Sequence, residues 1–361
     1  MGVQAHEYTA ETLALISKLL AQNPEYYTIW NYRRLLLQDV FHKELAHMSE
    51  GKSDESAGST QKDAGPLTSA EQEILLLIKE DLAFLIPLLK TFPKCYWIWN
   101  HRSWLLQQAS EHLPAASARQ LWQGEFALVG KMLSYDSRNF HGWHYRREVV
   151  KALEDIAAKE EAQKKTGPEE NGHDAHPATG TTSMTEQEFA YTTKMINTNL
   201  SNFSAWHNRL QLIPRVLNER SADSAARRKM LDDEFQLITE ALSTDPADSS
   251  LWFYHQYLLT TLSPSVPTKS MIVLDLTNQD RLQYLEQEID SVRAILDIWE
   301  DTDDCKWIYQ SLLGLATQYM DIEAGNKKFS TLEMRTWLDQ LEKLDPLRKG
   351  RWQDLRKSLS L

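Results

Sequence analysis

One short sequence pattern recurs along the chain and constrains its fold more than any other feature. A turn residue is followed by an aromatic residue, then by Trp-x-x-Arg and then by apolar residues, most clearly in residues 92–106, FPKCYWIWNHRSWLL. Self-similarity of this kind is the signature of repeat architectures, in which each unit packs on its neighbours. The pattern recurs at Trp30, Trp99, Trp143, Trp206 and Trp252, with a degenerate copy near Trp307.

The spacing of these tryptophans predicts the size of the repeat. The first five lie 69, 44, 63 and 46 residues apart. Both long gaps contain low-complexity stretches, residues 49–67 and 158–182, which we expect to be disordered inserts. Without these 19 and 25 residues the long gaps become 50 and 38, close to the short ones. A period of about 40 residues fits two helices and two turns, so the sequence predicts an all-α array of α-hairpins.

Within each of the first four copies, an aromatic residue lies three positions before the tryptophan and an arginine three positions after it. This spacing keeps all three on one side of a helix, as expected for side chains packed between adjacent hairpins. Such an arginine can stack on a ring or pair with a carboxylate. The fifth copy departs from the pattern, with Ser249 and His255 at these positions.

Local signals place several helix boundaries. A helix is predicted over Thr9–Gln22, and capping boxes are predicted at residues 68–71 and 185–188. Pro87 should kink or end the helix before the second copy. No alternation typical of β-hairpins stands out, so we predict one helical-repeat domain over residues 1–361.

Composition narrows the class of protein. The formal charge of −12 argues against a nucleic-acid backbone as the main partner. Cys95 and Cys305 are far apart, which suggests neither a disulfide framework nor a structural zinc site. The most apolar run, residues 74–89, is broken by charges and is not expected to span a membrane. Without a recognisable secretion signal at the N-terminus, we predict a cytoplasmic location.

No common catalytic signature is present in the sequence. His141-x-x-His144 could place two imidazoles near a metal, but no third ligand is evident, and Cys95 has no evident base to activate it. Lys94, Arg138 and His141 instead lie just before the tryptophans of adjacent repeats, which align on one surface in a solenoid. Free N–H groups at helix N-termini would help such a cluster bind an anion such as a diphosphate; the alternative is an ordinary solvated loop.

The repeats resemble the protein prenyltransferase alpha-subunit repeat. The resemblance rests on Tyr27-x-x-Trp30-x-x-Arg33, on residues 93–102 and on residues 139–146. Residues 245–255, DPADSSLWFYH, and residues 344–348, LDPLR, look most like the Rab-type (type II geranylgeranyl) branch in its short fungal form. The alpha subunit shared by farnesyltransferase and the type I enzyme is the alternative, and a non-catalytic helical-repeat scaffold is another.

The resemblance implies a right-handed superhelical crescent that wraps around a separate beta subunit. That subunit would hold a catalytic Zn²⁺, while this chain would need no cofactor of its own. The heterodimer would transfer geranylgeranyl from geranylgeranyl diphosphate to Rab GTPases presented by an escort protein. By resemblance, Lys94 would be catalytic at the diphosphate leaving group, with Tyr96 and His141 on the diphosphate side. Phe140 stands where the family often has tyrosine, so it lacks the hydroxyl that a polar role at this position needs.

Overall fold

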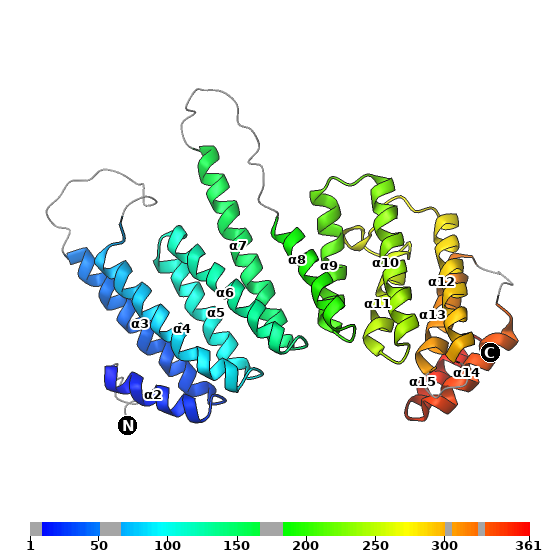
Figure 1. Ribbon diagram of the computed structural model, residues 1–361, viewed down its shortest axis with the longest axis horizontal. Coiled ribbons are helices and arrows are strands. Elements are labelled where there is room, and N and C mark those ends of the chain that lie inside the picture. The colour runs from blue at the N-terminus through cyan, green and yellow to red at the C-terminus, as the bar shows by residue number, and fades with distance from the viewer. Residues whose placement is uncertain (1–8, 51–65, 167–182, 300–304, 324–328) are drawn as a thin grey trace. The chain divides into compact units, whose positions relative to one another are not determined.

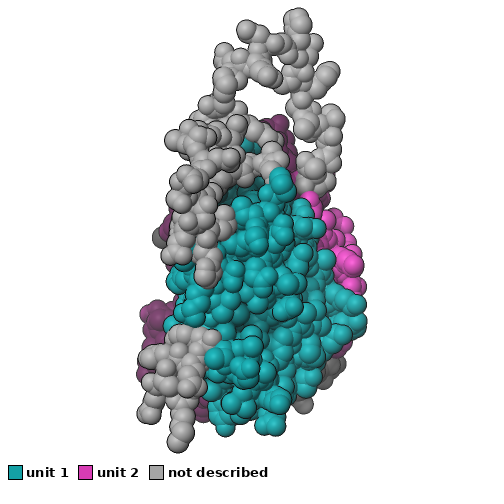
Figure 2. Space-filling model, turned by 90° about the vertical axis from the view of Figure 1, so that its left-hand side faces the viewer, with its two compact units in different colours: residues 1–176 teal, residues 177–361 magenta. Residues whose placement is uncertain are grey.

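The computed structural model describes residues 9–50, 66–166, 183–299, 305–323 and 329–361. They belong to two compact units, residues 1–176 and residues 177–361, which are coloured separately in Figure 2. All regular elements in these ranges are helices, with no strand, so the all-α prediction is confirmed. The prediction of a single repeat domain stays a prediction.

Unit 1 is a row of α-helices joined by short turns or by the stretches outside the described residues. Helices consecutive in the chain pack side by side from α2 to α7, which Figure 1 shows in blue to green. The elements are α2 (Ala10–Gln22), α3 (Tyr27–Glu50), α4 (Ser69–Thr91), α5 (Tyr96–His112), α6 (Ala115–Tyr135) and α7 (Phe140–Thr166).

Unit 2 repeats the same hairpin plan and then ends in shorter helices. Helix α14 packs on α13, and α15 packs on α14. The elements are α8 (Met184–Thr198), α9 (Phe203–Glu219), α10 (Ser224–Thr244), α11 (Ser249–Thr261), η1 (Thr268–Ser270), α12 (Asn278–Trp299), α13 (Lys306–Ile322), α14 (Thr331–Leu344), η2 (Pro346–Arg348) and α15 (Lys349–Ser358).

The repeat tryptophans are core residues, as predicted, and all five make the same polar contact. Each indole is at most 4% exposed. Each Nε1–H donates to the backbone carbonyl six residues earlier, at 2.7–2.9 Å, as Trp30 does to Pro24 and Trp99 does to Pro93. A buried indole needs such an acceptor, so one side chain fills the core and also fixes the turn that begins its helix.

The repeat arginines are buried as well, and Arg33, Arg102 and Arg209 each bind a carboxylate on the following helix. The Arg102 guanidinium donates to both Glu125 oxygens at 2.9 and 2.5 Å, and Arg209 does the same to Glu234 at 2.8 and 2.6 Å. The buried charges are therefore paired by bidentate hydrogen bonds. In the fifth copy the His255 imidazole replaces the guanidinium, and its Nε2 lies 2.9 Å from Glu288 Oε2.

A third side chain completes each of these sites, two positions after the tryptophan of the next repeat. Tyr145 donates its hydroxyl hydrogen to Glu125, and Tyr254 to Glu234, both at 2.6 Å. Each carboxylate therefore joins two successive repeats. We call these sets the buried triads: Arg33–Asp81–His101, Arg102–Glu125–Tyr145 and Arg209–Glu234–Tyr254.

The first buried triad carries the most perturbed carboxyl group. Burial by itself would raise the pKa of Asp81, but the hydrogen bond from His101 and the charge of Arg33 together lower it to about 2. Burial also lowers the pKa of His101, so this imidazole is neutral at pH 7. Its Nε2–H then donates to Asp81 at 2.7 Å, and its Nδ1 accepts from Arg34 Nε at 3.3 Å.

One boundary prediction is wrong, and one of the two alternatives predicted for Pro87, that it ends its helix, is excluded. The side chain that caps α8 is Ser183, which accepts from the Glu186 N–H, because the chain turns two residues before the predicted capping box; Thr185 lies inside the helix. Helix α4 continues through Pro87 to Thr91, because the preceding turns hold it against the core. The capping box at Thr68 is confirmed.

The predicted inserts are only partly described. Residues 51–65 and 167–182 lie outside the described residues. Residues 158–166, which we expected to begin the second insert, instead continue helix α7. Their Ala, Lys, Glu and Gln content explains this difference, because these are strong helix formers.

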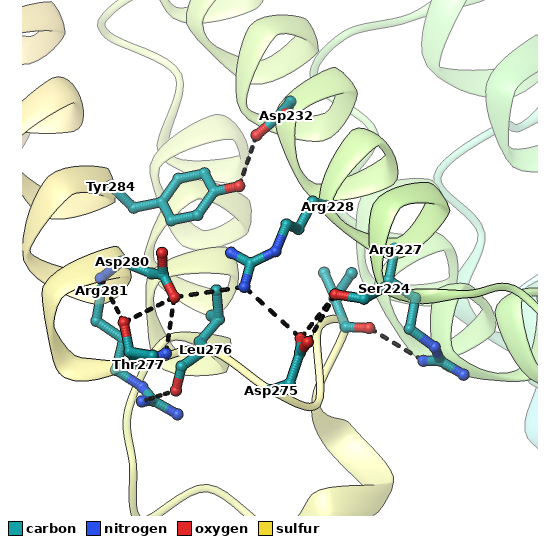
Figure 3. A network of polar contacts seen from close by, with 11 residues as sticks. Ser224, Arg227, Arg228, Asp232, Asp275, Leu276, Thr277, Asp280, Arg281 and Tyr284 are labelled. Carbon is teal, nitrogen blue, oxygen red and sulfur yellow. Dashed lines mark hydrogen bonds and ion pairs between the residues drawn. The ribbon is translucent and has the colours of Figure 1, made fainter.

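In unit 2, a long connection between α11 and α12 contains η1 and is held against α10. Ser224 Oγ donates to the carboxylate of Asp275 at 2.7–2.9 Å. Arg228 Nη2 lies 3.7 Å from that carboxylate and 3.3 Å from Asp280, at the start of α12 (Figure 3). These contacts fix the connection at the beginning of the next hairpin.

Candidate functional site

The three predicted site residues lie at two neighbouring helix starts of unit 1. Lys94 is in the turn between α4 and α5, Tyr96 is the first residue of α5, and His141 is the second residue of α7. The centroids of the Tyr96 and His141 rings are 6.3 Å apart. The structure therefore brings residues from two repeats to one surface, as the alignment of repeats predicts.

Asn139 connects these two helix starts and was not identified from the sequence as a site residue. Its side chain is buried, and its Nδ2 donates to the Pro93 carbonyl at 2.9 Å. Its Oδ1 accepts from the backbone N–H groups of His141 and Gly142, at 3.0 and 3.2 Å. Asn139 thus caps α7 and ties it to the turn that carries Lys94. A capping-type residue four positions before a repeat tryptophan was the available signal.

The Asn139 cap corrects the prediction that free N–H groups at these helix starts help to bind an anion. The N–H groups of His141 and Gly142 already have an acceptor in Asn139, so they are not free for an anion. At the start of α5, the N-cap position is Cys95, whose side chain makes no capping hydrogen bond. The correction therefore applies to the start of α7, whereas the start of α5 has no side-chain cap.

The cluster is also less uniformly basic than the sequence suggests. Lys94 Nζ lies 3.7 Å from Asp136 Oδ2, and the backbone N–H of Arg138 donates to the same carboxylate at 3.3 Å. The Lys94 side chain is 71% exposed and that of Asp136 is 37% exposed. An exposed ion pair of this kind contributes about 0–1 kcal/mol, so Lys94 can exchange Asp136 for another anion.

The partial burial of His141 lowers its pKa, and the nearby His144 lowers it further, while Glu25 opposes the shift. The imidazole is therefore mainly neutral at pH 7 and offers a single N–H donor. The Tyr96 hydroxyl accepts from Asn100 Nδ2 at 3.3 Å, which leaves its own hydrogen available to a ligand.

Exposed aromatic rings occur at or just before the starts of α3, α5 and α7. Tyr26, Tyr27, Tyr96 and Phe140 are each about half exposed or more. The Phe140 ring lies 4.1 Å from that of His141, centroid to centroid. Phe140 therefore supports the imidazole by packing, and it has no hydroxyl to donate. The surface combines an exposed cation with two neutral donors and exposed aromatic rings, an arrangement that can bind a phosphate-like anion next to an apolar group.

Two other sites considered from the sequence, a Cys95 nucleophile and a metal bound by His141 and His144, gain no support. Cys95 is buried, its Sγ donates to the Pro24 carbonyl at 3.5 Å, and burial raises the pKa of the thiol, so little thiolate is present at pH 7. His144 is exposed and faces Glu148, with Nε2 and Oε1 3.5 Å apart. No group of three or more His, Cys, Asp or Glu side chains suited to a metal occurs among the described residues.

Of the helices in the described ranges, none combines the length and apolar character needed to cross a membrane. This agrees with the sequence-based prediction for residues 74–89, which lie within α4.

Comparison with protein families identifies the repeats. The protein prenyltransferase alpha subunit repeat matches five segments, and each contains one of the five repeat tryptophans. The degenerate copy near Trp307 lies outside them. The matched segments are residues 9–40, 78–109, 122–153, 185–216 and 231–262.

Whole-chain comparisons extend this similarity. The geranylgeranyl transferase type-2 subunit alpha of Saccharomyces cerevisiae is 33% identical over 350 residues, covering 96% of this chain and 84% of the yeast protein. Its Schizosaccharomyces pombe counterpart is 32% identical over 363 residues, covering 98% and 87%. The rat protein of the same name is 32% identical over 263 residues, which are 72% of this chain but only 36% of the rat chain.

Among solved structures, the chain is similar to one in Candida albicans protein geranylgeranyltransferase-I complexed with GGPP. The TM-score is 0.56 at 19% sequence identity, and the match covers 99% of this chain and 86% of that one. At this identity the likeness shows the helical-repeat fold and nothing more specific.

Proposed function

Because the chain belongs to the family of geranylgeranyl transferase type-2 alpha subunits, we propose that it acts with a beta subunit on Rab GTPases. In this proposal the heterodimer transfers a geranylgeranyl group from geranylgeranyl diphosphate to C-terminal cysteines of Rab proteins that an escort protein presents in the cytoplasm. The observation that supports a role for this chain in the reaction is the surface formed by Lys94, Tyr96 and His141.

The reaction creates negative charge that this surface can stabilise. A cysteine sulfur forms a bond to C1 of the isoprenoid while the bond from C1 to the diphosphate oxygen breaks, and the diphosphate leaves with the electron pair. We place a zinc ion in the beta subunit, where it would keep the attacking sulfur as thiolate. The charge on the departing diphosphate grows as the bond breaks, so a cation placed there favours the transition state over the bound substrate.

Lys94 is the residue of this chain best suited to that role. Its ammonium forms an exposed ion pair with Asp136, and its side chain extends from a turn that Asn139 and Trp99 fix through the Pro93 carbonyl. The Tyr96 hydroxyl and the neutral His141 can add hydrogen bonds without adding charge. A preorganised group at a developing charge lowers the activation barrier by about 3–4 kcal/mol.

The test is to co-express Lys94→Ala with the beta subunit and measure single-turnover transfer to a Rab with its escort protein. We expect a rate at least about tenfold lower, since about 1.4 kcal/mol of barrier corresponds to a tenfold change in rate, with unchanged heterodimer assembly. Lys90→Ala is the matched control, because Lys90 is another exposed lysine, at the end of α4. An unchanged rate in Lys94→Ala would show that Lys94 does not act at the leaving group.

Pairing tests the identity of the partner. We expect the chain to form a stable complex with a type-2 beta subunit and to modify Rab proteins. Stable pairing with a farnesyltransferase beta subunit and modification of a CaaX peptide would contradict the type-2 proposal, and failure to pair with any beta subunit would leave only a scaffold.

A further inference from the structure

A chain of hydrogen bonds connects Tyr96, at the proposed site, to the first buried triad. It passes through two residues that the proposed mechanism does not use, Arg34 on α3 and Asn100 on α5. Arg34 Nη2 donates to Asn100 Oδ1 at 2.5 Å, and Asn100 Nδ2 donates to the Tyr96 hydroxyl oxygen at 3.3 Å. Arg34 Nε also donates to His101 Nδ1, at 3.3 Å. These contacts join the start of α5 to α3.

The guanidinium of Arg34 fixes the direction of the bonds in this chain. A guanidinium has donors and no acceptor, so the side-chain atom of Asn100 that faces Arg34 is the amide oxygen. The amide nitrogen can only donate, and it faces Tyr96, so the Tyr96 hydroxyl oxygen accepts. The hydroxyl hydrogen of Tyr96 therefore takes no part in the chain, and it can be donated to a ligand.

The first buried triad holds Arg34 from the other side. Because the neutral His101 donates its Nε2–H to Asp81 at 2.7 Å, its Nδ1 presents a lone pair to Arg34. The acceptors in both hydrogen bonds of Arg34, on Asn100 and His101, are neutral, so no carboxylate cancels the guanidinium charge at these contacts. That charge polarises the Asn100 amide and strengthens the next hydrogen bond in the chain.

The Asn100 amide has two orientations, and Arg34 selects one of them. Without the guanidinium, either the nitrogen or the oxygen of the amide can face Tyr96. When the oxygen faces Tyr96, it accepts the hydroxyl hydrogen and takes it from a ligand. Arg34 therefore distinguishes a Tyr96 that donates to a ligand from a Tyr96 that donates to its own helix.

We propose that Arg34 and Asn100 are positioning residues for the transfer reaction, which hold the Tyr96 hydroxyl as a hydrogen-bond donor to the departing diphosphate. This role rests on the proposed function, because the diphosphate of that reaction is the acceptor. A donor that is already oriented toward the developing charge needs no reorganisation when the bond from C1 to oxygen breaks. Arg34 and Asn100 act through Tyr96 and do not contact the diphosphate themselves.

The test is a double-mutant cycle in the heterodimer with the beta subunit, followed by single-turnover transfer at saturating geranylgeranyl diphosphate. Tyr96→Phe removes the hydroxyl and should lower the rate about tenfold or more, as expected for a hydrogen bond to a charged group. Arg34→Leu should lower the rate by about threefold or more, but by no more than Tyr96→Phe does, because it removes only what the hydroxyl contributes. In the Tyr96→Phe background, Arg34→Leu should change the rate by less than about twofold.

Variants that keep or reverse the donor test the direction of the bonds. Arg34→Lys keeps a cationic donor for Asn100 and should transfer at a rate within about twofold of the parent. Asn100→Asp has acceptors only, so it should keep the contact with Arg34, take the hydrogen of Tyr96 and slow transfer about as much as Tyr96→Phe. The matched control is Arg147→Leu, because Arg147 follows its repeat tryptophan by four residues, as Arg34 does, but lies on α7. Its rate should be unchanged.

Stability is measured for each variant by thermal unfolding, and the rates are compared at a temperature below every transition. An equal loss from Arg34→Leu with and without the Tyr96 hydroxyl would overturn the positioning role. A normal rate in Arg34→Leu together with a slow Tyr96→Phe would also overturn it, and would leave the proposed function intact. A normal rate in Tyr96→Phe would remove the donor, while Lys94→Ala would still test the leaving-group role. No transfer by the parent heterodimer would contradict the proposed function and, with it, this role.

Discussion

Removing one arginine from a buried triad should destabilise unit 2 far more than removing an equally well-bonded arginine from its surface. The perturbation is Arg209→Leu. Arg209 donates to both Glu234 oxygens and to Thr193 Oγ1, and its guanidinium carbon lies 4.1 Å from the centroid of the Phe189 ring. Its matched control is Arg220→Leu, because Arg220 makes the same bidentate contact with Glu186, at 2.6 and 2.8 Å.

The two sites differ in burial, and this difference sets the expected magnitudes. The side chains of Arg209 and Glu234 are 8% and 2% exposed, whereas those of Arg220 and Glu186 are 48% and 26% exposed. Removing one partner of a buried ion pair leaves an uncompensated charge and costs about 3–5 kcal/mol. An exposed pair contributes about 0–1 kcal/mol. The buried carboxylate keeps one donor, Tyr254, which moderates the cost toward the lower figure of about 3 kcal/mol.

The assay is urea unfolding of the full chain, followed by far-ultraviolet circular dichroism and by tryptophan fluorescence. Both variants lie in unit 2, so they should act on the same transition. The double variant Arg209→Leu/Glu234→Leu should recover much of the lost stability, because it leaves no buried charge unpaired. Equal effects of Arg209→Leu and Arg220→Leu, or no recovery in the double variant, would refute the role assigned to the buried triads.

Two further predictions concern unit 1. The lowered pKa of Asp81 stabilises the folded state above about pH 4, and this stabilisation is lost as the pH falls through about 2. At 1.36 kcal/mol per pKa unit, the free energy of unfolding gains about 2 kcal/mol from this group. Asp81→Asn should remove that part of the pH dependence in denaturation curves measured between pH 5 and pH 2, and an unchanged profile would contradict it. Asn139→Ala should lower the free energy of unfolding by about 1–2 kcal/mol through the lost cap, and it should also slow Rab modification. The control is Asn202→Ala, which removes the cap of α9; it should lower stability but leave the transfer rate unchanged.

The recurring tryptophan pattern was sufficient to predict the fold class. A side chain as large as tryptophan, repeated with an aromatic residue and an arginine at helical spacing, can be buried only between stacked helices. The period of the pattern therefore indicated α-hairpins from residue spacing alone. The sequence did not predict every helix boundary. Several neighbouring residues can cap a helix such as α8, and the place where the chain turns in space selects Ser183.

The candidate site was predicted in part. The sequence placed Lys94, Tyr96 and His141 at equivalent positions of adjacent repeats, and the structure brings the rings of Tyr96 and His141 within 6.3 Å of each other. It could not show that Asn139 joins the two turns, that Asp136 pairs with Lys94, or that the first N–H groups of α7 are already bonded. These contacts depend on how consecutive hairpins pack.

The sequence by itself therefore determined the repeat, its helical period, the burial of its tryptophans and the family to which the chain belongs. All four follow from local periodicity and residue type, which a linear pattern records. The tertiary structure decided which carboxylate each repeat arginine binds, because the partner lies 48 residues away for Arg33 but only 23 for Arg102. It also decided that Asn139 joins the starts of α5 and α7, since this contact depends on atoms that meet only when distant helices pack together.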